Sequence, residues 1–247
     1  MEGTYEFIKP RFELICVLQL LRGSISLEEE KSTFGHMKPF QFKQFAVHQD
    51  RCVMKVGTDG VLLGAWTSLD QRPETILDIG AGTGLIALQL AQRSVAETID
   101  AIELDEAAYE QCVANFEGSP WSDRLFCYHA GFDEFVDEIE EQYDLIVSNP
   151  PFYAEEVGSG SVSRDHARQN SSLPFDELVE GVAKLLSEHG RFSVIVPFKE
   201  EWNMLDLANR SRLYPQRITR VKGNASVEYK RSLMEFGFKK VEVIEDE

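Results

Sequence analysis

The sequence predicts an α/β protein built on a seven-stranded, mostly parallel, doubly wound sheet, with a small hairpin on its N-terminal side. Three observations support this fold class. Short apolar runs alternate with helical patterns, glycine or polar residues follow directly where those runs end, and the last two β-forming segments have no helical pattern between them. Alternating strands and helices are typical of a parallel sheet, and a final pair without a helix is typical of an antiparallel closure.

The elements are expected in a simple order along the chain. Residues 40–47 alternate like a half-buried strand, and 51–56 are expected to pair with them as the hairpin. Thr58 and Asp59 would then cap a short helix. The remaining expectations are sheet strands at 75–77, 98–102, 125–129, 143–148, 191–196, 217–221 and 232–238, and helices at 60–66, 85–91, 106–116, 174–190 and 199–209.

A glycine turn follows the first sheet strand. It reads Asp78-Ile79-Gly80-Ala81-Gly82-Thr83-Gly84 and leads into a helical pattern. A strand, a glycine turn and a helix form the nucleotide-binding unit of a doubly wound sheet, and glycines let the backbone approach a ligand closely. Because Leu85 stands where a dinucleotide fingerprint continues towards its third glycine, the turn favours S-adenosylmethionine over a pyrophosphate. Asp78 is expected to order the turn.

Polar residues also end the next strands. Glu103 follows the second strand, about 20 residues after the glycines, where an acidic side chain can accept both ribose hydroxyls. Gly131 lies in the turn after the third strand. Because ligands bind beyond the carboxyl ends of parallel strands, Gly80, Gly82, Gly84, Glu103 and Gly131 are expected at one cofactor site. Thr58 and Asp59 either cap their helix or approach the amino end of the cofactor.

The fourth strand ends in Asn149-Pro150-Pro151-Phe152-Tyr153. Two prolines stop the strand and stiffen the turn. The Asn149 side-chain oxygen and the Pro150 carbonyl can accept protons from a planar amine, and Phe152 can stack on its face. This stretch therefore predicts catalysis by Asn149, Pro150 and Phe152, with Asn149 beside the cofactor and Tyr153 beside the substrate.

Composition narrows the class of protein. No apolar run is long enough to span a bilayer, and the four cysteines are scattered without metal-ligand spacing. We therefore expect a cytoplasmic protein without a metal, acting as a monomer. A formal net charge of −17 disfavours a nucleic-acid partner.

Basic residues nevertheless cluster near the C-terminus and after the Asn149 loop. Such a cluster is either a solvated face or a local patch that attracts a phosphate backbone. Its members are Arg164, Arg168, Arg210, Arg212, Arg217, Arg220, Lys222, Lys230 and Arg231, of which Arg164, Arg168, Arg217 and Arg220 are the strongest substrate-binding candidates.

From about residue 40 to 238 the chain resembles the class I S-adenosylmethionine-dependent methyltransferases that methylate amines. More narrowly it resembles the bacterial valine-tRNA adenine-N6 methyltransferase family. The resemblance rests on the segments 42–45, 55–66, 78–84, 149–153, 164–168, 190–192 and 195–197, and the segment 55–66 is its most specific part. The resemblance implies S-adenosylmethionine as cofactor, tRNA as partner, and methyl transfer to the N6 amine of an adenine beside the anticodon.

Two places depart from the family pattern. Many class I enzymes hold the cofactor adenine with an acidic residue directly after the third strand, whereas here Asp133 comes later. Residues 1–36 have no counterpart in the resemblance. They are expected to pack poorly or to precede the true start at Met37, with the methyltransferase domain spanning 37–247.

Three alternatives stay open. The Asn-Pro-Pro-aromatic loop also serves glutamine methylation in release factors and guanine-N2 methylation in ribosomal RNA, and the acidic charge suits a protein substrate. A second alternative is a non-catalytic domain that binds S-adenosylmethionine and docks on RNA or a protein. The third, a nicotinamide oxidoreductase, is disfavoured by Leu85 and by the Asn149 loop.

Overall fold

The chain divides into two units, Met1–Gly35 and His36–Glu247. The computed structural model describes residues 38–151 and 173–246, all within the second unit. The predicted extension 1–36 therefore lies outside the described residues, and its poor packing stays a prediction.

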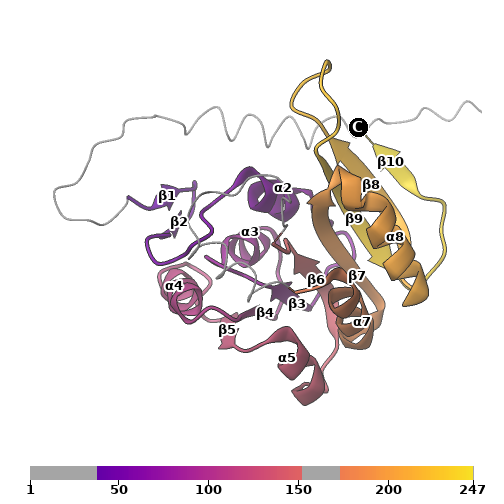
Figure 1. Ribbon diagram of the computed structural model, residues 1–247. Helices are drawn as coiled ribbons and strands as arrows, with labels where there is room; N and C mark the ends of the chain where they lie inside the picture. Colours follow the sequence, from indigo (N-terminus) through magenta and orange to yellow (C-terminus); the bar gives the residue numbers. More distant parts are fainter. Residues whose placement is uncertain (1–37, 152–172, 247) are drawn as a thin grey trace, which may run out of the picture. The chain divides into compact units, whose positions relative to one another are not determined.

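An eight-stranded sheet forms the centre of the described unit (Figure 1). Its strand order is β10-β8-β9-β7-β6-β3-β4-β5. The strands are β3 (Thr75–Ile79), β4 (Thr98–Glu103), β5 (Leu125–His129), β6 (Tyr143–Ser148), β7 (Leu186–Pro197), β8 (Tyr214–Val221), β9 (Arg231–Gly237) and β10 (Ile244–Asp246).

The pairing confirms a mostly parallel, doubly wound sheet. Strands β3 to β7 pair in parallel, and β9 runs antiparallel to both β7 and β8. Strand β10 joins β8 as an eighth strand that the sequence did not predict. Its three residues are all exposed and two are acidic, so they carry no apolar signal.

Helices cover both faces of the sheet (Figure 1). On one face α2 (Thr58–Trp66) packs on α3 (Leu85–Arg93), and α4 (Glu106–Glu117) packs on β4 and β5. On the other face α5 (Phe132–Glu138) packs on α7 (Phe175–Leu185), which packs on α8 (Glu201–Arg210). Because helices cover both faces, the central strands are continuous apolar runs, and Leu77, Ile146 and Phe192 are fully buried.

The hairpin differs from the expectation. Residues 40–47 do not form one strand; they fold back as β1 (Phe40–Gln41) and β2 (Ala46–Val47), with Phe40 opposite Val47. The Phe42 and Phe45 rings stack at 4.6 Å across the turn, which stabilises it. Residues 51–56 contain no strand. The predicted helix cap was also wrong, since α2 is preceded by Gly57 and has no side-chain cap.

The boundary between α7 and β7 was predicted too late. The helix ends at Leu185 and not near Gly190, and β7 begins at Leu186, opposite Tyr143. The polar residues around His189 are compatible with a helix end and with an exposed strand. Pairing with β6 therefore determines that this segment is a strand. His189 therefore lies in β7 and not at the end of a helix.

Candidate active site

A cavity of about 360 Å³ lies at the carboxyl ends of the parallel strands. Its wall includes Gly80 and Gly82 after β3, Glu103 at the end of β4, Gly131 after β5, and Asn149 after β6. The structure therefore brings together residues from four separate strand ends, where the sequence predicted a ligand.

The three glycines of the turn have two different functions. All have positive φ angles, +71° at Gly80, +56° at Gly82 and +77° at Gly84, which other residues rarely adopt. A Cβ at Gly80 or Gly82 would meet nothing within 4 Å, so these two leave open space for a ligand. A Cβ at Gly84 would lie 2.5 Å from Phe116 Cε1, so this glycine lets α3 pack closely against α4.

Glu103 joins the second strand to the glycine turn. Its Oε2 accepts a hydrogen bond from the Gly82 N–H at 2.7 Å, and its Oε1 accepts one from the Asp105 N–H at 2.9 Å. These bonds fix the carboxylate at the cavity wall. Each oxygen keeps a further lone pair, so the predicted acceptance of ribose hydroxyls is compatible with this arrangement.

Asp78 lies behind the turn and has no exposed surface. Its Oδ2 accepts a hydrogen bond from the Ala87 N–H of α3 at 3.0 Å. Burial raises the pKa of the carboxyl group from 3.8 to about 7, opposed by this hydrogen bond. Asp78 is not among the residues lining the cavity, so it ties the start of α3 to β3 and orders the turn indirectly.

Asn149 has a buried acceptor without a partner. It lines the cavity with Pro150 and Pro151, and its Oδ1 makes no hydrogen bond to any described residue. The preceding Ser148 is anchored, because its Oγ donates to the Ile79 carbonyl oxygen at 3.0 Å. Buried acceptors are nearly always satisfied, so Asn149 Oδ1 has the properties of a group that awaits a donor from a ligand.

Other predicted site residues fall into two groups. Phe152, Tyr153, Arg164 and Arg168 lie outside the described residues. Thr58 and Asp59 begin α2 and are not part of the cavity wall. Asp59 instead accepts a hydrogen bond from Arg231 Nε at 2.8 Å.

Other residues of the wall were not predicted. The segment Cys52-Val53-Met54 lines the cavity, and Val53 and Met54 are more than half exposed. Their exposure on the cavity wall follows from the tertiary structure, and no local sequence pattern indicates it. Burial raises the pKa of the Cys52 thiol to about 12, which keeps it neutral. Asp133, whose role was in doubt, also lines the cavity.

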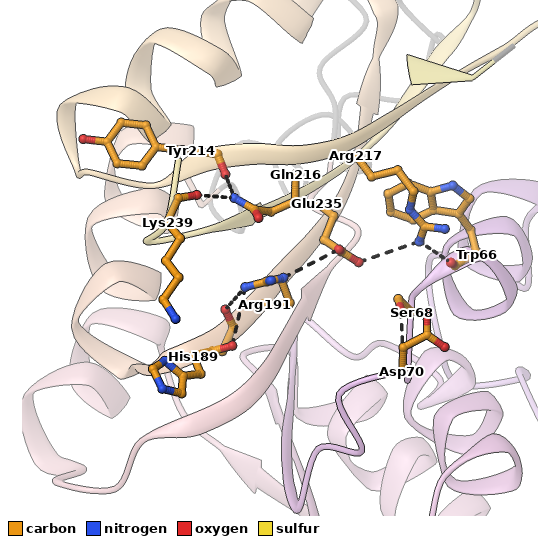
Figure 2. Close-up of polar contacts among 11 residues, drawn as sticks. Trp66, Ser68, Asp70, His189, Arg191, Tyr214, Gln216, Arg217, Glu235 and Lys239 are labelled. Carbon is orange, nitrogen blue, oxygen red and sulfur yellow. Dashed lines mark hydrogen bonds and ion pairs between the residues drawn. The ribbon is translucent and has the colours of Figure 1, made fainter. Parts of the chain in front are cut away.

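Arg217 and Arg220 have carboxylate partners within the protein. The Arg217 guanidinium lies 3.9 Å from the centre of the Trp66 ring, and its Nη2 donates to the Trp66 carbonyl oxygen at 2.8 Å. Figure 2 shows Glu235 lying between Arg217 and Arg191, at 3.7 and 3.8 Å. Arg220 bonds to Glu201 and Glu245. These contacts stabilise the packing of β8, so the predicted substrate role of both arginines is less favoured.

The described residues offer neither a metal site nor a helix that spans a membrane. No cluster of three or more His, Cys, Asp and Glu side chains in residues 38–151 and 173–246 is placed to hold a metal ion. Within the same ranges, no helix combines the length and apolar character needed to cross a membrane.

Known proteins place this geometry in a family. The methyltransferase small domain family matches residues 60–203. A tRNA1(Val) (adenine(37)-N6)-methyltransferase of Christiangramia forsetii is 59% identical over 212 residues, covering 85% of this chain and 88% of that protein. The chain belongs to the tRNA1(Val) (adenine(37)-N6)-methyltransferase family. Another family member, from Flavobacterium psychrophilum, is 64% identical over 197 residues, covering 80% of this chain and 84% of its own.

Solved structures agree with this family at the level of the fold. The ribosomal protein L11 methylase of Lactobacillus delbrueckii has a TM-score of 0.57 at 11% identity, covering 85% of this chain and 91% of its own. At this identity the similarity shows only that both have the Rossmann-like methyltransferase fold.

The cavity fits S-adenosylmethionine, the cofactor of this family. Open space at the Cβ positions of Gly80 and Gly82 lets the ligand approach the backbone. Glu103 is fixed at the end of the second strand, where it can hold a ribose, and Asn149 Oδ1 is a free acceptor next to the same space. The described residues thus provide one acceptor suited to the cofactor ribose and one suited to an amine substrate.

Proposed function

We propose that this protein transfers a methyl group from S-adenosylmethionine to the N6 amine of adenine 37 in a valine tRNA. Two relatives at about 60% identity carry that activity in their names, and they share most of their length with this chain. The observation in the structure that supports the proposal most directly is Asn149, a residue of the cavity wall whose buried Oδ1 has no hydrogen-bond partner among the described residues.

The residues of the site can promote this reaction without a general base. S-adenosylmethionine supplies an electrophilic methyl group on a sulfonium. The adenine amine is a poor nucleophile because its lone pair is delocalised into the ring. Asn149 Oδ1 and the Pro150 carbonyl oxygen accept hydrogen bonds from the two N–H groups of the amine. These bonds orient the nitrogen lone pair and stabilise the positive charge that develops on nitrogen. Pro150 and Pro151 have no backbone N–H, so neither can donate a competing hydrogen bond to Asn149 Oδ1 or to the Pro150 carbonyl oxygen.

Positioning provides much of the remaining rate enhancement. The anchored Ser148 and the two prolines fix the Asn149 loop relative to the glycine turn, because Ser148 bonds to Ile79 of the neighbouring strand. Phe152 is proposed to stack on the extruded adenine, where base stacking is worth about 1–3 kcal/mol. We further propose that the protein acts as a monomer in the cytoplasm.

Methyl incorporation from labelled S-adenosylmethionine tests the substrate class. Unmodified total tRNA, ribosomal RNA and a release factor would be supplied separately at equal concentration. We expect label in the tRNA alone. Label in the release factor would instead support a protein substrate, which the net charge of −17 favours. Binding of the cofactor without incorporation into any of the three would support the non-catalytic alternative.

A further inference from the structure

A group of exposed aromatic and lysine side chains lies beside the active site. Three chain segments contribute to it, namely the 3-10 helix η1 (Phe198–Glu200), the start of α8, and the connection between β8 and β9. Trp202 is 80% exposed and Phe198 is 37% exposed, which is unusual for side chains of this size. This aromatic–lysine patch consists of Phe198, Lys199, Trp202, Lys222, Tyr229 and Lys230.

Contacts within the aromatic–lysine patch hold its segments together. The Phe198 and Tyr229 rings are 5.3 Å apart, and the Lys222 ammonium lies 4.6 Å from the centre of the Tyr229 ring. The Phe198 N–H donates to the Lys230 carbonyl oxygen at 3.1 Å. The Phe198 and Tyr229 rings are therefore held in one arrangement, which lowers the entropy lost when a flat ligand stacks on them.

The strand register places the aromatic–lysine patch at the same edge of the sheet as the catalytic loop. Strand β7 runs parallel to β6, and it ends at Pro197, directly before Phe198. Arg231 pairs with Pro197, so the connection that precedes β9 reaches this edge too. The end of β7 that leads into the patch therefore lies one strand away from the end of β6, where Asn149 follows.

The charges of the patch suit a polyanion. The nearby arginines are neutralised, because Arg220 pairs with Glu201 and Glu245 and Arg231 pairs with Asp59. In contrast, neither Lys199 nor Lys230 forms an ion pair with another residue that the structure describes, and both are exposed. Lys199 and Lys230 therefore present two ammonium groups that the other described residues do not neutralise, on an otherwise acidic protein.

We propose that the aromatic–lysine patch binds single-stranded nucleotides of the RNA substrate that flank the target adenine. Trp202, Phe198 and Tyr229 stack on the bases, and Lys199 and Lys230 contact the phosphates. This combination of stacking rings and cations is the one by which proteins hold unpaired nucleic acid. The proposal rests on the proposed function, because it takes tRNA as the substrate.

Two variants with matched controls test the patch. The first is Trp202→Ala, with Phe126→Ala on the edge strand β5 as control, since Phe126 is also an exposed ring. The second is the double variant Lys199→Gln/Lys230→Gln. Its control is Lys239→Gln/Lys240→Gln, which removes the same charge just beyond the other end of β9. Filter binding of unmodified tRNA would be measured across a salt series, with cofactor affinity and melting temperature measured in parallel.

The two kinds of variant should differ in their salt dependence. Trp202→Ala should weaken tRNA binding roughly fivefold or more with little change in the salt slope. The double lysine variant should weaken binding and flatten the slope of log K against log salt by about one to two units. Cofactor affinity and melting temperature should stay at wild-type values, and both controls should bind as wild type does.

The patch proposal can fail independently of the proposed function. If wild-type protein methylates tRNA but both patch variants bind tRNA as their controls do, the proposal that the patch binds RNA is overturned and the proposed function stands. If the patch variants keep tRNA affinity and lose a protein partner, the proposal of an RNA surface is also overturned. If wild-type protein methylates no tRNA, the proposed function fails and the patch proposal fails with it.

Discussion

Asn149 and Asn115 carry the same side chain with opposite hydrogen-bonding states. Asn115 is buried on α4, where its Nδ2 donates to the His48 and Thr83 carbonyl oxygens and its Oδ1 accepts from the His48 N–H. Asn149 Oδ1 has no partner among the described residues. Fully bonded asparagines contribute to stability, whereas an unsatisfied buried acceptor costs stability and is retained for another reason.

Alanine substitution at these two asparagines should therefore give different results. Asn149→Ala should lower the methylation rate about 10²–10³-fold, as expected when a transition-state acceptor is lost. Its melting temperature and cofactor affinity should remain near those of wild type. Asn115→Ala should lower the free energy of unfolding by about 2–4 kcal/mol, because three hydrogen bonds disappear. Single-turnover kinetics and urea denaturation would measure both; turnover of Asn149→Ala within threefold of wild type would contradict its role.

Asp78 should make stability depend on pH. Its pKa in the folded protein is about 7, above the ordinary value of 3.8, so the folded state binds more protons than the unfolded chain between these values. Stability conferred by the neutral carboxyl is present below about pH 4 and is lost as pH rises towards 7 and above. Asp78→Asn keeps an acceptor for the Ala87 N–H but cannot ionise. Relative to wild type, this variant should gain up to about 4 kcal/mol between pH 4 and pH 8 in urea denaturation. A pH-independent difference would show that Asp78 is charged throughout.

The glycine turn contributes both to the stability of the fold and to the ligand cavity. Gly84 serves the packing of the helices, and Gly82 leaves space for the ligand. Both Gly82 and Gly84 have positive φ angles, so alanine at either position strains the backbone by about 1–2 kcal/mol. Only at Gly84 would the new Cβ also collide with Phe116 and Cys112.

Gly84→Ala should therefore reduce stability more than Gly82→Ala, by several kcal/mol in total, since the core between α3 and α4 must shift. Gly82→Ala should fold but lose cofactor affinity at least tenfold, because its methyl group enters the ligand space. Thermal denaturation and calorimetric titration with S-adenosylmethionine would measure the two effects. Equal losses of stability in the two variants, with unchanged S-adenosylmethionine affinity in Gly82→Ala, would contradict the different roles of the two glycines.

Elements with a strong local signal were predictable from the sequence. The bounds of β5 and β6 were predicted to the residue, because each is an apolar run of β-forming residues closed by turn residues. The helix predicted at 106–116 forms as α4, and Asp105, directly before it, caps it by accepting from the Ala108 N–H. The convergence of Gly80, Glu103 and Asn149 followed from the rule that ligands bind at the carboxyl ends of parallel strands.

Elements decided by tertiary contacts were not predictable. The start of β7 depends on pairing with Tyr143, and the hairpin 40–47 depends on a stack between two phenylalanines. The partners of Arg217 and Arg220 also come from distant segments, namely Trp66, Glu201, Glu235 and Glu245. A cluster of arginines in the sequence therefore did not reveal that those charges are neutralised.

At the scale of the whole molecule, the buried glutamates Glu201 and Glu235 are each compensated by arginines. Glu201 is 3% exposed, and Arg220 bonds to it through both Nε and Nη2. This carboxylate raises the pKa of Arg220 above its ordinary value. Arg210 and Asp206 form a comparable pair on α8, but both side chains are mostly exposed.

Arg220→Gln should therefore act on stability. It leaves Glu201 buried without its cation, which should cost about 3 kcal/mol in free energy of unfolding. Arg210→Gln, the matched control, should cost less than about 0.5 kcal/mol because exposed pairs contribute little. Urea denaturation would measure both. A stable Arg220→Gln variant with weakened tRNA binding would restore the original expectation that Arg220 contacts the substrate.

The identity of the methylated nucleoside tests the central claim most directly. Unmodified valine tRNA would be incubated with labelled S-adenosylmethionine and either wild-type protein or Asn149→Ala, digested, and separated by mass spectrometry. We expect labelled N6-methyladenosine from position 37 with wild-type protein, and none above background with the variant. Label in N2-methylguanosine, at an adenine elsewhere in the tRNA, or equally with both proteins would contradict this claim.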